Sequence, residues 1–294
     1  NDSKIILASS GNLNEVSVVI ENDLWKGVVG KELKTIFSKP IYGLPQQEKQ
    51  FILRQMPPAV FSGFATKSRV IIKIEQNKKK AARVVSNKYA SPQKIIIISG
   101  ENSNEIVEQI RLSANKTRKI LKTIEIREKQ RRIKKSLSTS PVLEKTFNIS
   151  LDYPSVYREA GVSENFVWLR KDTKNGSVNL LIFETPLTKE KSKQGKTIIV
   201  RDSVAKRKIP GPIKGTYMST DPEYITVSKP LLINNKKGTE TRGLWEVKNQ
   251  FMGGPFINFS VIDSINKRTL YLDGFVYSPG TTKADYVFEL EAII

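Results

Sequence analysis

Few side chains in this sequence are of the types that carry out the chemistry of most enzymes. The 294 residues include no cysteine and no histidine. Their absence excludes Ser-His-Asp and Cys-His catalysis, disulfide bonds and the commonest zinc ligands. An enzyme built from this chain has to use carboxylates, lysine, tyrosine or a Ser-Lys pair. We assign no catalytic residue, and we expect no cofactor and no metal ion.

Two catalytic arrangements, a Ser-Lys pair and a pair of carboxylates, need neither cysteine nor histidine. The sequence gives no specific signal for either of them. The Ser-x-x-Lys spacing of serine acyl-enzymes occurs four times, which is typical of chance in a lysine-rich chain, and the accompanying Ser-Asp-Asn and Lys-Thr-Gly elements are absent. A carboxylate-based hydrolase needs two acids at a set distance in space, which sequence spacing does not give. Its candidates are Asp202, Asp221 and Glu246. We expect a binding protein rather than an enzyme, with the hydrolase as an alternative.

Positive charge is the strongest signal in the composition. Lys and Arg number 49 against 29 Asp and Glu, a net charge of +20. Seventeen basic and five acidic residues lie between Lys78 and Lys135, so this segment holds +12 of the excess. Such a concentration favours a basic face for an anionic partner, although a solvated helix surface is the commoner explanation of a charge run.

The basic segment ends in a helix whose apolar stripe fades. Apolar residues recur at helical spacing from Ile106 to Ile124, and after Ile126 they become sparse. We therefore expect the end of this helix to project or fray into solvent. It carries the predicted binding residues Arg127, Lys129, Arg131, Arg132, Lys134 and Lys135. The segment from Lys116 to Lys135 has no aromatic residue to stack on bases, which makes nucleic acid an unlikely partner.

The elements that position these residues indicate an α+β fold with mixed, largely antiparallel sheets and packed helices. In the first half, strands are expected at 15–21, 50–56, 69–75 and 94–99, with a helix from 22 to about 38 and the long helix from 101. The apolar strand at 94–99 should be central in a sheet covered on both faces.

The second half is expected to begin near the small, polar segment 138–145. Strands are expected at 146–151, 166–171, 177–185, 197–200, 242–249, 256–263 and 269–277, the last three as an antiparallel meander. Short helices are expected at 154–160 and 201–209, a polar loop at 189–194, and a final helix at 284–294. The organisation is thus an N-terminal tether at 1–14, one α+β half at 15–140 and another at 141–294. The similar element order favours two related halves, although their identity is too low to demonstrate a repeat.

The segment from Arg242 to Phe259 is the second candidate site. Trp245 and Val247 share one parity of a strand, so the Trp face should be buried. Gly253-Gly254-Pro255 is expected to form a sharp corner between two strands, because proline lacks a donor and glycine favours bends. The corner with Arg242, Trp245, Gly253 and Gly254 is either a packed hairpin end or a place where a ligand or protein binds.

Several motifs in this region and elsewhere resemble one family. "RGLWE" (242–246), "FMGGPF" (251–256), "GFVYSP" (274–279) and "LEA" (290–292) resemble the C-terminal signature of the domain-of-unknown-function family DUF4837 of Bacteroidetes lipoproteins. "GLPQQEKQF" (43–51), "SPQ" (91–93), "RD" (201–202) and "IPG" (209–211) are similar to its other landmarks in the same order. One departure is at 67–69, where a His-Arg-Asn-like stretch is expected and histidine is missing.

The resemblance implies a place for the protein but no activity. It implies export to the cell envelope, on the periplasmic side or at the outer membrane, with a lipid-modified cysteine just before Asn1 as the anchor. The chain has no run of about 18 apolar residues, so we expect no transmembrane helix.

Our main hypothesis is binding of anionic lipid or lipopolysaccharide by the basic helix end. The alternative is a structural or assembly partner of another envelope protein that contacts the Trp245–Phe256 region.

Overall fold

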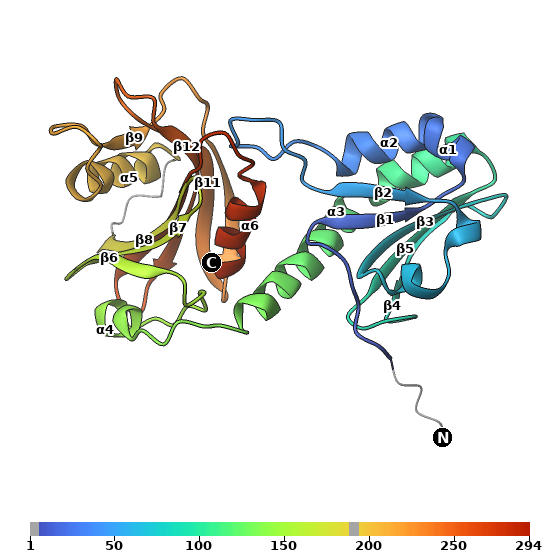
Figure 1. Cartoon of the computed structure of the whole chain (residues 1–294), viewed down its shortest axis with the longest axis horizontal. Helices are drawn as coiled ribbons and strands as arrows, with labels where there is room; N and C mark the ends of the chain where they lie inside the picture. The colour runs from blue at the N-terminus through green and yellow to red at the C-terminus, as the bar shows by residue number, and fades with distance from the viewer. Residues whose placement is uncertain (1–5, 188–193) are drawn as a thin grey trace. The chain divides into compact units, whose positions relative to one another are not determined.

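The computed structural model describes residues 6–187 and 194–294 (Figure 1). The chain divides into two compact units, each with its own sheet. The first unit comprises Asn1–Pro40 and Lys49–Lys129, and the second comprises Ile41–Glu48 and Gln130–Ile294. The division falls inside the long helix α3 (Ser103–Ile133). Each unit is described by itself below.

The first unit has a five-stranded sheet in the order β2-β1-β3-β5-β4. Strands β2, β1, β3 and β5 run parallel, and β4 is antiparallel to β5. Parallel neighbours need crossover connections: α1 (Asn22–Lys26) and α2 (Val28–Phe37) lie in the connection from β1 to β2, whereas β4 lies in the connection from β3 to β5. The strands are β1 (Glu15–Val19), β2 (Ile52–Met56), β3 (Val70–Gln76), β4 (Ala81–Ser86) and β5 (Lys94–Gly100).

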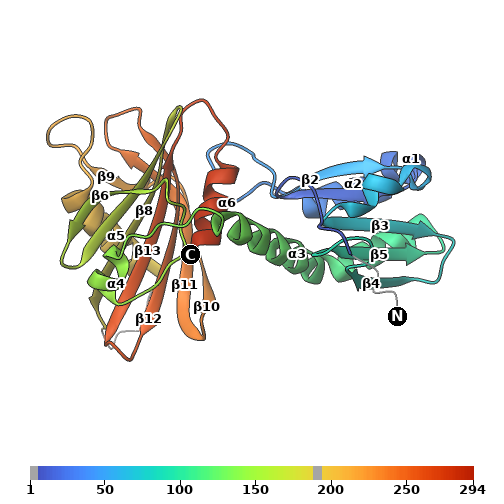
Figure 2. The same cartoon turned by 60° about the horizontal axis from the view of Figure 1, so that its bottom comes forward.

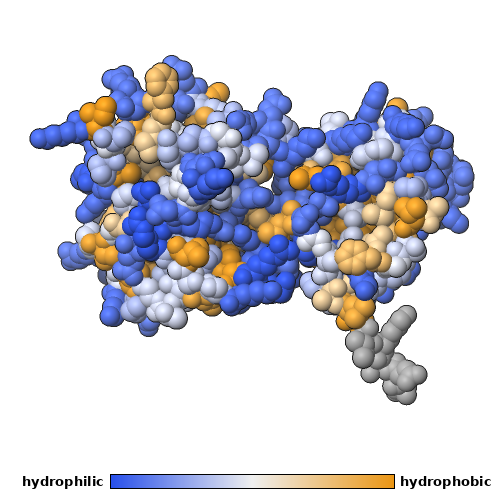
Figure 3. Space-filling view, viewed as in Figure 1, coloured by the Kyte–Doolittle hydropathy of each residue, from blue (hydrophilic) through white to orange (hydrophobic). Residues whose placement is uncertain are grey.

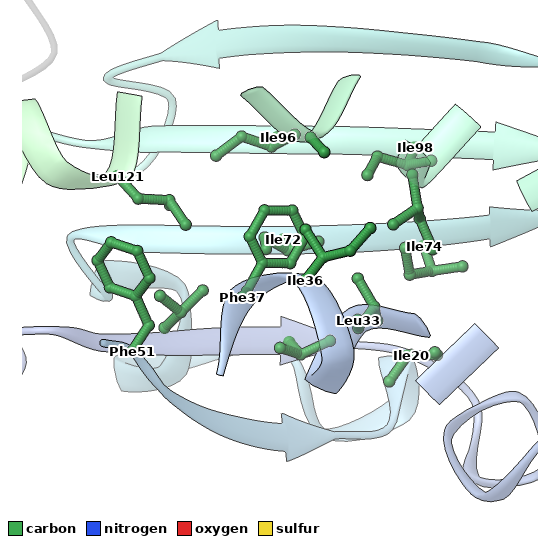
Figure 4. Close-up of a cluster of buried hydrophobic side chains, with 14 of the residues drawn as sticks. Ile20, Leu33, Ile36, Phe37, Phe51, Ile72, Ile74, Ile96, Ile98 and Leu121 are labelled. Atoms are coloured by element: carbon green, nitrogen blue, oxygen red, sulfur yellow. The ribbon is translucent and has the colours of Figure 1, made fainter. Parts of the chain in front are cut away.

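The helices of the first unit bury one face of this sheet. The helices on this face are α1, α2 and α3. Two 3-10 helices, η1 (Pro58–Val60) and η2 (Gly63–Lys67), lie between β2 and β3. Leu33 and Phe37 of α2, Ile72 of β3, Ile96 of β5 and Leu121 of α3 meet in one core (Figure 4). On the opposite face, a smaller cluster includes two β5 isoleucines and Phe61. The expectation that the strand at 94–99 is covered on both faces is confirmed.

Two details of the first unit differ from the sequence predictions. The helix expected from 22 to 38 is two helices, because Gly27 has an extended backbone between them. Strand β4 was not expected, since its residues are mostly exposed and show no apolar alternation. An edge strand gains its structure from pairing with its neighbour, which leaves little trace in its own sequence.

The second unit is built on an eight-stranded sheet with the order β10-β11-β12-β13-β8-β7-β6, to which β9 adds by pairing with β11. All of these pairs are antiparallel. The strands are β6 (Arg158–Ser163), β7 (Phe166–Thr173), β8 (Gly176–Pro186), β9 (Met218–Thr220), β10 (Val227–Ile233), β11 (Lys236–Val247), β12 (Gly253–Asp263) and β13 (Arg268–Tyr277). The meander expected in the last three is confirmed.

Two helices cover opposite faces of the large sheet (Figure 2). Val204 and Ala205 of α5 (Gln194–Lys208) pack in a core with Phe183 and Phe275. On the other face, α6 (Ala284–Ile293) lies so close to the sheet that a side chain at Gly274 would meet Leu290 at 2.8 Å. The short helix α4 (Val142–Phe147) precedes the sheet.

Three local predictions in the second unit are wrong. The strand expected at 146–151 is the end of α4 followed by irregular chain, because Asn148 adopts a left-handed conformation (φ 52°) that ends the helix. The helix expected at 154–160 is a turn leading into β6. The strand expected at 197–200 belongs to α5, whose buried face overrides the β preference of its Ile and Val residues. The loop expected at 189–194 lies almost entirely outside the described residues.

The α+β class and the largely antiparallel pairing are confirmed. Three of the eleven strand pairs are parallel, and all three are in the first unit. The two sheets therefore do not repeat one topology. Within the described part of the chain, no helix is long and apolar enough to cross a membrane.

Candidate functional site: the basic end of helix α3

The end of α3 is positioned by a buried ion pair. Glu125 lies on the same side of the helix as Leu121, four residues earlier, and both are fully buried. Arg69, directly before β3, is also buried and donates from Nε and Nη2 to the two carboxylate oxygens of Glu125, each at 2.8 Å. This two-point geometry is the strongest form of an arginine–carboxylate contact.

Further hydrogen bonds complete this network. Arg69 Nη2 donates to the carbonyl oxygen of Asn12 at 2.8 Å, and Nη1 donates to that of Gly11 at 3.3 Å. The backbone N–H of Asn14 donates to Glu125 Oε2 at 2.8 Å. Glu128 is also buried, with Oε1 4.0 Å from Arg69 Nη1. Both acids near the end of α3 are therefore turned into the first unit.

The outward side of the helix end is basic as a result. Arg127, Arg131 and Arg132 lie in α3, and Lys134 and Lys135 follow it directly; all five side chains are exposed, whereas Lys129 is half-buried. In Figure 3, the surface over the last turns of α3 is strongly hydrophilic. Cations at a helix C-terminus also interact favourably with the helix dipole.

Ion pairing within the molecule covers this surface only in part. Lys134 Nζ lies 3.6 Å from Asp152 Oδ2, but both side chains are more than half exposed, and such pairs contribute little to stability. Lys129, Arg131 and Arg132 also interact within the molecule. Exposure and like charge, rather than a lack of partners, define this surface.

The helix end does not fray, which corrects the sequence prediction. The helix is regular to Ile133, and Ile133 is buried with 5% of its surface exposed. Ile126 lies seven residues earlier, about two helical turns, so the two isoleucines are on the same side. The burial of Ile133 therefore anchors the last turn of α3.

The corner expected at the second candidate site is not present. Gly253, Gly254 and Pro255 do not form a corner; they begin β12 and pair with Glu246, Trp245 and Leu244 of β11. The turn lies in the preceding residues, 248–252. Trp245 is buried as expected, with 2% of its surface exposed.

The glycine at 254 has a packing role. A Cβ there would lie 2.1 Å from the carbonyl oxygen of Val276 and 3.2 Å from Trp245 Nε1. Because Gly254 has no Cβ, the indole N–H of Trp245 reaches across β12 and donates to the carbonyl oxygen of Val276 at 3.2 Å. Arg242 is likewise interior, hydrogen-bonded to Glu240 and Glu291. Burial acts to raise the pKa of Glu240, but the charges and hydrogen bonds of Arg242 and Lys229 bring it below its usual value.

Two of the three acids proposed for a hydrolase, Asp202 and Asp221, have structural partners. Asp202 Oδ1 accepts hydrogen bonds from the backbone N–H and the hydroxyl of Thr220, at 2.9 and 2.7 Å. Asp221 accepts one from the backbone N–H of Glu223. The described residues contain no group of three or more acids that could hold a metal ion.

A second buried arginine network was missed by sequence reasoning. Arg201 of α5 donates from Nε to Asp273 Oδ1 at 3.0 Å, and its guanidinium lies 3.9 Å from the centre of the Phe256 ring. Asn258 also donates to Asp273 Oδ1, while Asp273 Oδ2 and Asn258 Oδ1 have no hydrogen-bond partner among the described residues. Burial raises the pKa of Asp273 despite the nearby Arg201 charge. The alternation of Asp273 with Tyr271 and Phe275 was a sequence signal for this buried acid.

Fold and surface define a two-unit α+β protein with a basic helix end and no assembled catalytic group among the described residues. A family model described as a domain of unknown function, DUF4837, matches residues 136–294. The chain belongs to this family. A second model, also described as a domain of unknown function, DUF8532, matches residues 9–134.

Matches to other known proteins are weak. No curated protein matches the chain. The human StarD13 (DLC2) lipid transfer and protein localization domain is 9% identical, with 47% of this chain and 89% of that chain covered and a TM-score of 0.23. A structure from Bacteroides thetaiotaomicron VPI-5482 is 14% identical, with 49% of this chain and 42% of that chain covered and a TM-score of 0.20. These scores are too low to carry an argument about fold or function.

Proposed function

We propose that this protein is a binding protein of the cell envelope whose basic end of α3 contacts an anionic surface. The observation that carries the proposal is the opposite orientation of the two charge types on one helix end. Glu125 and Glu128 are buried with Arg69, whereas Arg127, Arg131, Arg132, Lys134 and Lys135 are exposed. A helix with mixed charge in sequence thus presents mostly positive charge to solvent.

The physics of such a surface favours phosphate-bearing lipid head groups. Each basic residue near an anionic membrane contributes about 1 kcal/mol, and the attraction is lost beyond about one Debye length, roughly 8 to 10 Å in physiological salt. No aromatic side chain lies between Lys116 and Lys135, so the surface offers charge without a stacking platform. These properties support anionic lipid or lipopolysaccharide as the partner.

The envelope location belongs to the same proposal and is supported by membership of the DUF4837 family together with the resemblance of its motifs to envelope lipoproteins. The alternative partner, an envelope protein that docks on the Trp245–Phe256 region, loses its main support because both side chains are 2% exposed.

Vesicle sedimentation tests the proposal. The protein is mixed with vesicles of phosphatidylcholine alone or with phosphatidylglycerol added, at low and at physiological salt. We expect binding only to the anionic vesicles, decreasing with salt. Reversal of the five exposed cations to Glu (Arg127, Arg131, Arg132, Lys134 and Lys135) should reduce binding by about tenfold or more, since each contributes about 1 kcal/mol.

A matched control variant distinguishes an effect of the α3 site on vesicle binding from an effect of the protein's net charge. Lys78, Lys79, Lys80, Arg83 and Lys88 are also exposed and lie in or next to β4. Reversal of these five changes the net charge by the same amount and should leave vesicle binding within about threefold of the original, because residues remote from the contact act only through the screened field of the molecule. Equal losses in the two variants, or no loss in the first, would refute the proposal.

A further inference from the structure

A groove in the second unit runs along α5. It has a volume of about 610 Å³, within the range of roughly 300 to 1,000 Å³ typical of small-molecule sites. One wall is α5, and the other comprises parts of β7, β8 and the turn between β6 and β7. The lining includes Phe166, Phe183, Ile199, Ser203, Arg207 and Lys208.

The α5 wall changes from apolar to basic along its length. Ile199, Ser203 and Arg207 are spaced by four residues and form one row on the helix surface. Val200, Val204 and Lys208 form a second row next to it. Eight residues of helix span about 12 Å, so the apolar start and the basic end of the groove are separated by that length.

The apolar part has the composition of a contact surface. Ile199 is 70% exposed and lines the groove. On the sheet side, Phe166 and Phe183 are almost fully buried, and Phe183 stacks on Tyr271 with ring centres 5.0 Å apart. These rings are held in place by packing, and Ile199 of α5 is the exposed aliphatic side chain of the lining.

The basic end is suited to an anion. Lys208 Nζ donates to the hydroxyl of Ser163 at 3.1 Å and lies 5.4 Å from the centre of the Phe166 ring, which directs the ammonium group toward this end of the groove. Arg207 is exposed on the same turn. Two acids also line the groove: Glu184 accepts a hydrogen bond from Arg268 at 2.6 Å, and Glu164 lies on the β6–β7 turn.

We propose that this groove binds a free single-chain amphipathic anion, an alkyl carboxylate, with its chain along Ile199 and Val200 and its carboxylate at Arg207 and Lys208. The match between the length and polarity of the groove and this ligand class carries the proposal. It does not depend on the role of α3, because the two sites have no residue in common.

Isothermal titration calorimetry on the full chain tests this site with three probes. Dodecanoate, below its micelle concentration, carries both features; dodecanol keeps the chain without the charge, and butanoate keeps the charge with little chain. We expect dodecanoate to bind at least tenfold more tightly than either. Absence of dodecanoate binding, or equal binding of dodecanol, overturns the proposal.

Variants locate the binding within the groove. Ser203→Trp fills the middle of the first row at an exposed position and should abolish dodecanoate binding. The double variant R207E/K208E should weaken it at least tenfold, whereas Glu164→Gln should strengthen it by removing the remaining negative charge. The control is Lys206→Glu, which changes an exposed residue of the same helix turn outside the groove lining.

The Lys206→Glu control should bind dodecanoate with an affinity within about twofold of that of the unchanged protein. Melting temperatures confirm that every variant is folded. Dodecanoate binding that is unchanged in the Ser203→Trp variant would place the ligand elsewhere and overturn the proposal. A loss in the Lys206→Glu variant as large as that in the double variant would do the same, because it would show an effect of net charge alone.

Discussion

Helices α3 and α5 both end in basic residues, and both are held by a buried arginine–carboxylate pair, but the charges are exchanged. In α3 the helix contributes the acid, Glu125, and the partner is Arg69 beside β3. In α5 the helix contributes the arginine, Arg201, and the partner is Asp273 of β13. Burial of the pair thus removes negative charge from the surface of α3 and positive charge from that of α5.

The surroundings of the cations that do not take part in the buried pairs also differ between the ends of α3 and α5. Those at the end of α3 have no aromatic residue near them in sequence and form an open basic surface. Those of α5 lie near rings, with Lys206 Nζ 4.9 Å from the Tyr217 ring centre and Lys208 beside Phe166 at the end of a groove. We therefore propose different partners for two helix ends of similar composition: an extended anionic surface for α3 and a small amphipathic anion for α5.

The largest effect that tests this comparison is on stability. Arg69→Met removes the counter-charge of the fully buried Glu125 and should lower the free energy of unfolding by about 3 to 5 kcal/mol. Chemical denaturation followed by circular dichroism measures it. The control is Arg111→Met, which removes an exposed pair with Glu32 and should cost about 0 to 1 kcal/mol. Similar costs for the two would show that the buried network does not anchor α3.

Replacement of each buried acid, Glu125 and Asp273, by its amide should lower the free energy of unfolding by different amounts. Both oxygens of Glu125 accept hydrogen bonds, so Glu125→Gln turns an N–H₂ toward a donor and should cost about 1 to 3 kcal/mol. Asp273→Asn can place its N–H₂ at the position of Oδ2, which has no hydrogen-bond partner among the described residues. It should cost less than Glu125→Gln in the same denaturation assay. The reverse order would contradict our distinction between a saturated and an unsaturated network.

A smaller effect is the pH dependence of stability, to which two acids of the second unit, Asp273 and Asp263, should contribute with opposite signs. Burial raises the pKa of Asp273 above its usual 3.8, so the folded protein keeps a proton that the unfolded chain has lost. This group's contribution to stability therefore falls as pH rises from about 3.8 through the raised value. Asp273→Asn should remove that decrease.

At Asp263, burial acts to raise the pKa, but hydrogen bonds from Asn266, Lys236 and Arg268 lower it well below the usual value. Its contribution is present above the usual aspartate pKa and is lost as pH falls toward the lowered value. Asp263→Asn should therefore reduce the loss of stability in acid. Unfolding free energies measured between acidic and neutral pH check both signs, and equal slopes in the two variants would contradict them.

The sequence predicted the sheets better than it predicted the sites. The β-branched and aromatic residues of β8, β12 and β13 were sufficient to place these strands, whose residues are buried almost continuously. The position of Glu125, four residues after Leu121, was a sequence signal for an acid on the core side of α3 that our sequence predictions did not use. Its partner, Arg69, lies 56 residues away in sequence and could not be inferred.

Two other failures have physical causes outside the local sequence. The Thr197–Val200 segment has a strand composition, yet it is helical because α5 packs Val204 and Ala205 into the core of the sheet. Gly253-Gly254-Pro255 reads as a corner, yet the absence of a side chain at Gly254 serves the passage of Trp245 over β12. In both cases the contact that decides the structure involves residues on another element.

The most direct test of the central claim compares matched charge reversals at the two helix ends. One variant changes Arg131, Arg132 and Lys134 of the α3 end to Glu, and the other changes Lys206, Arg207 and Lys208 of α5 to Glu. Partition onto phosphatidylglycerol vesicles should fall about tenfold or more for the α3 variant, because each cation contributes about 1 kcal/mol, and should stay near the original value for the α5 variant. Equal partition of the two variants would contradict the assignment of the anionic surface to α3.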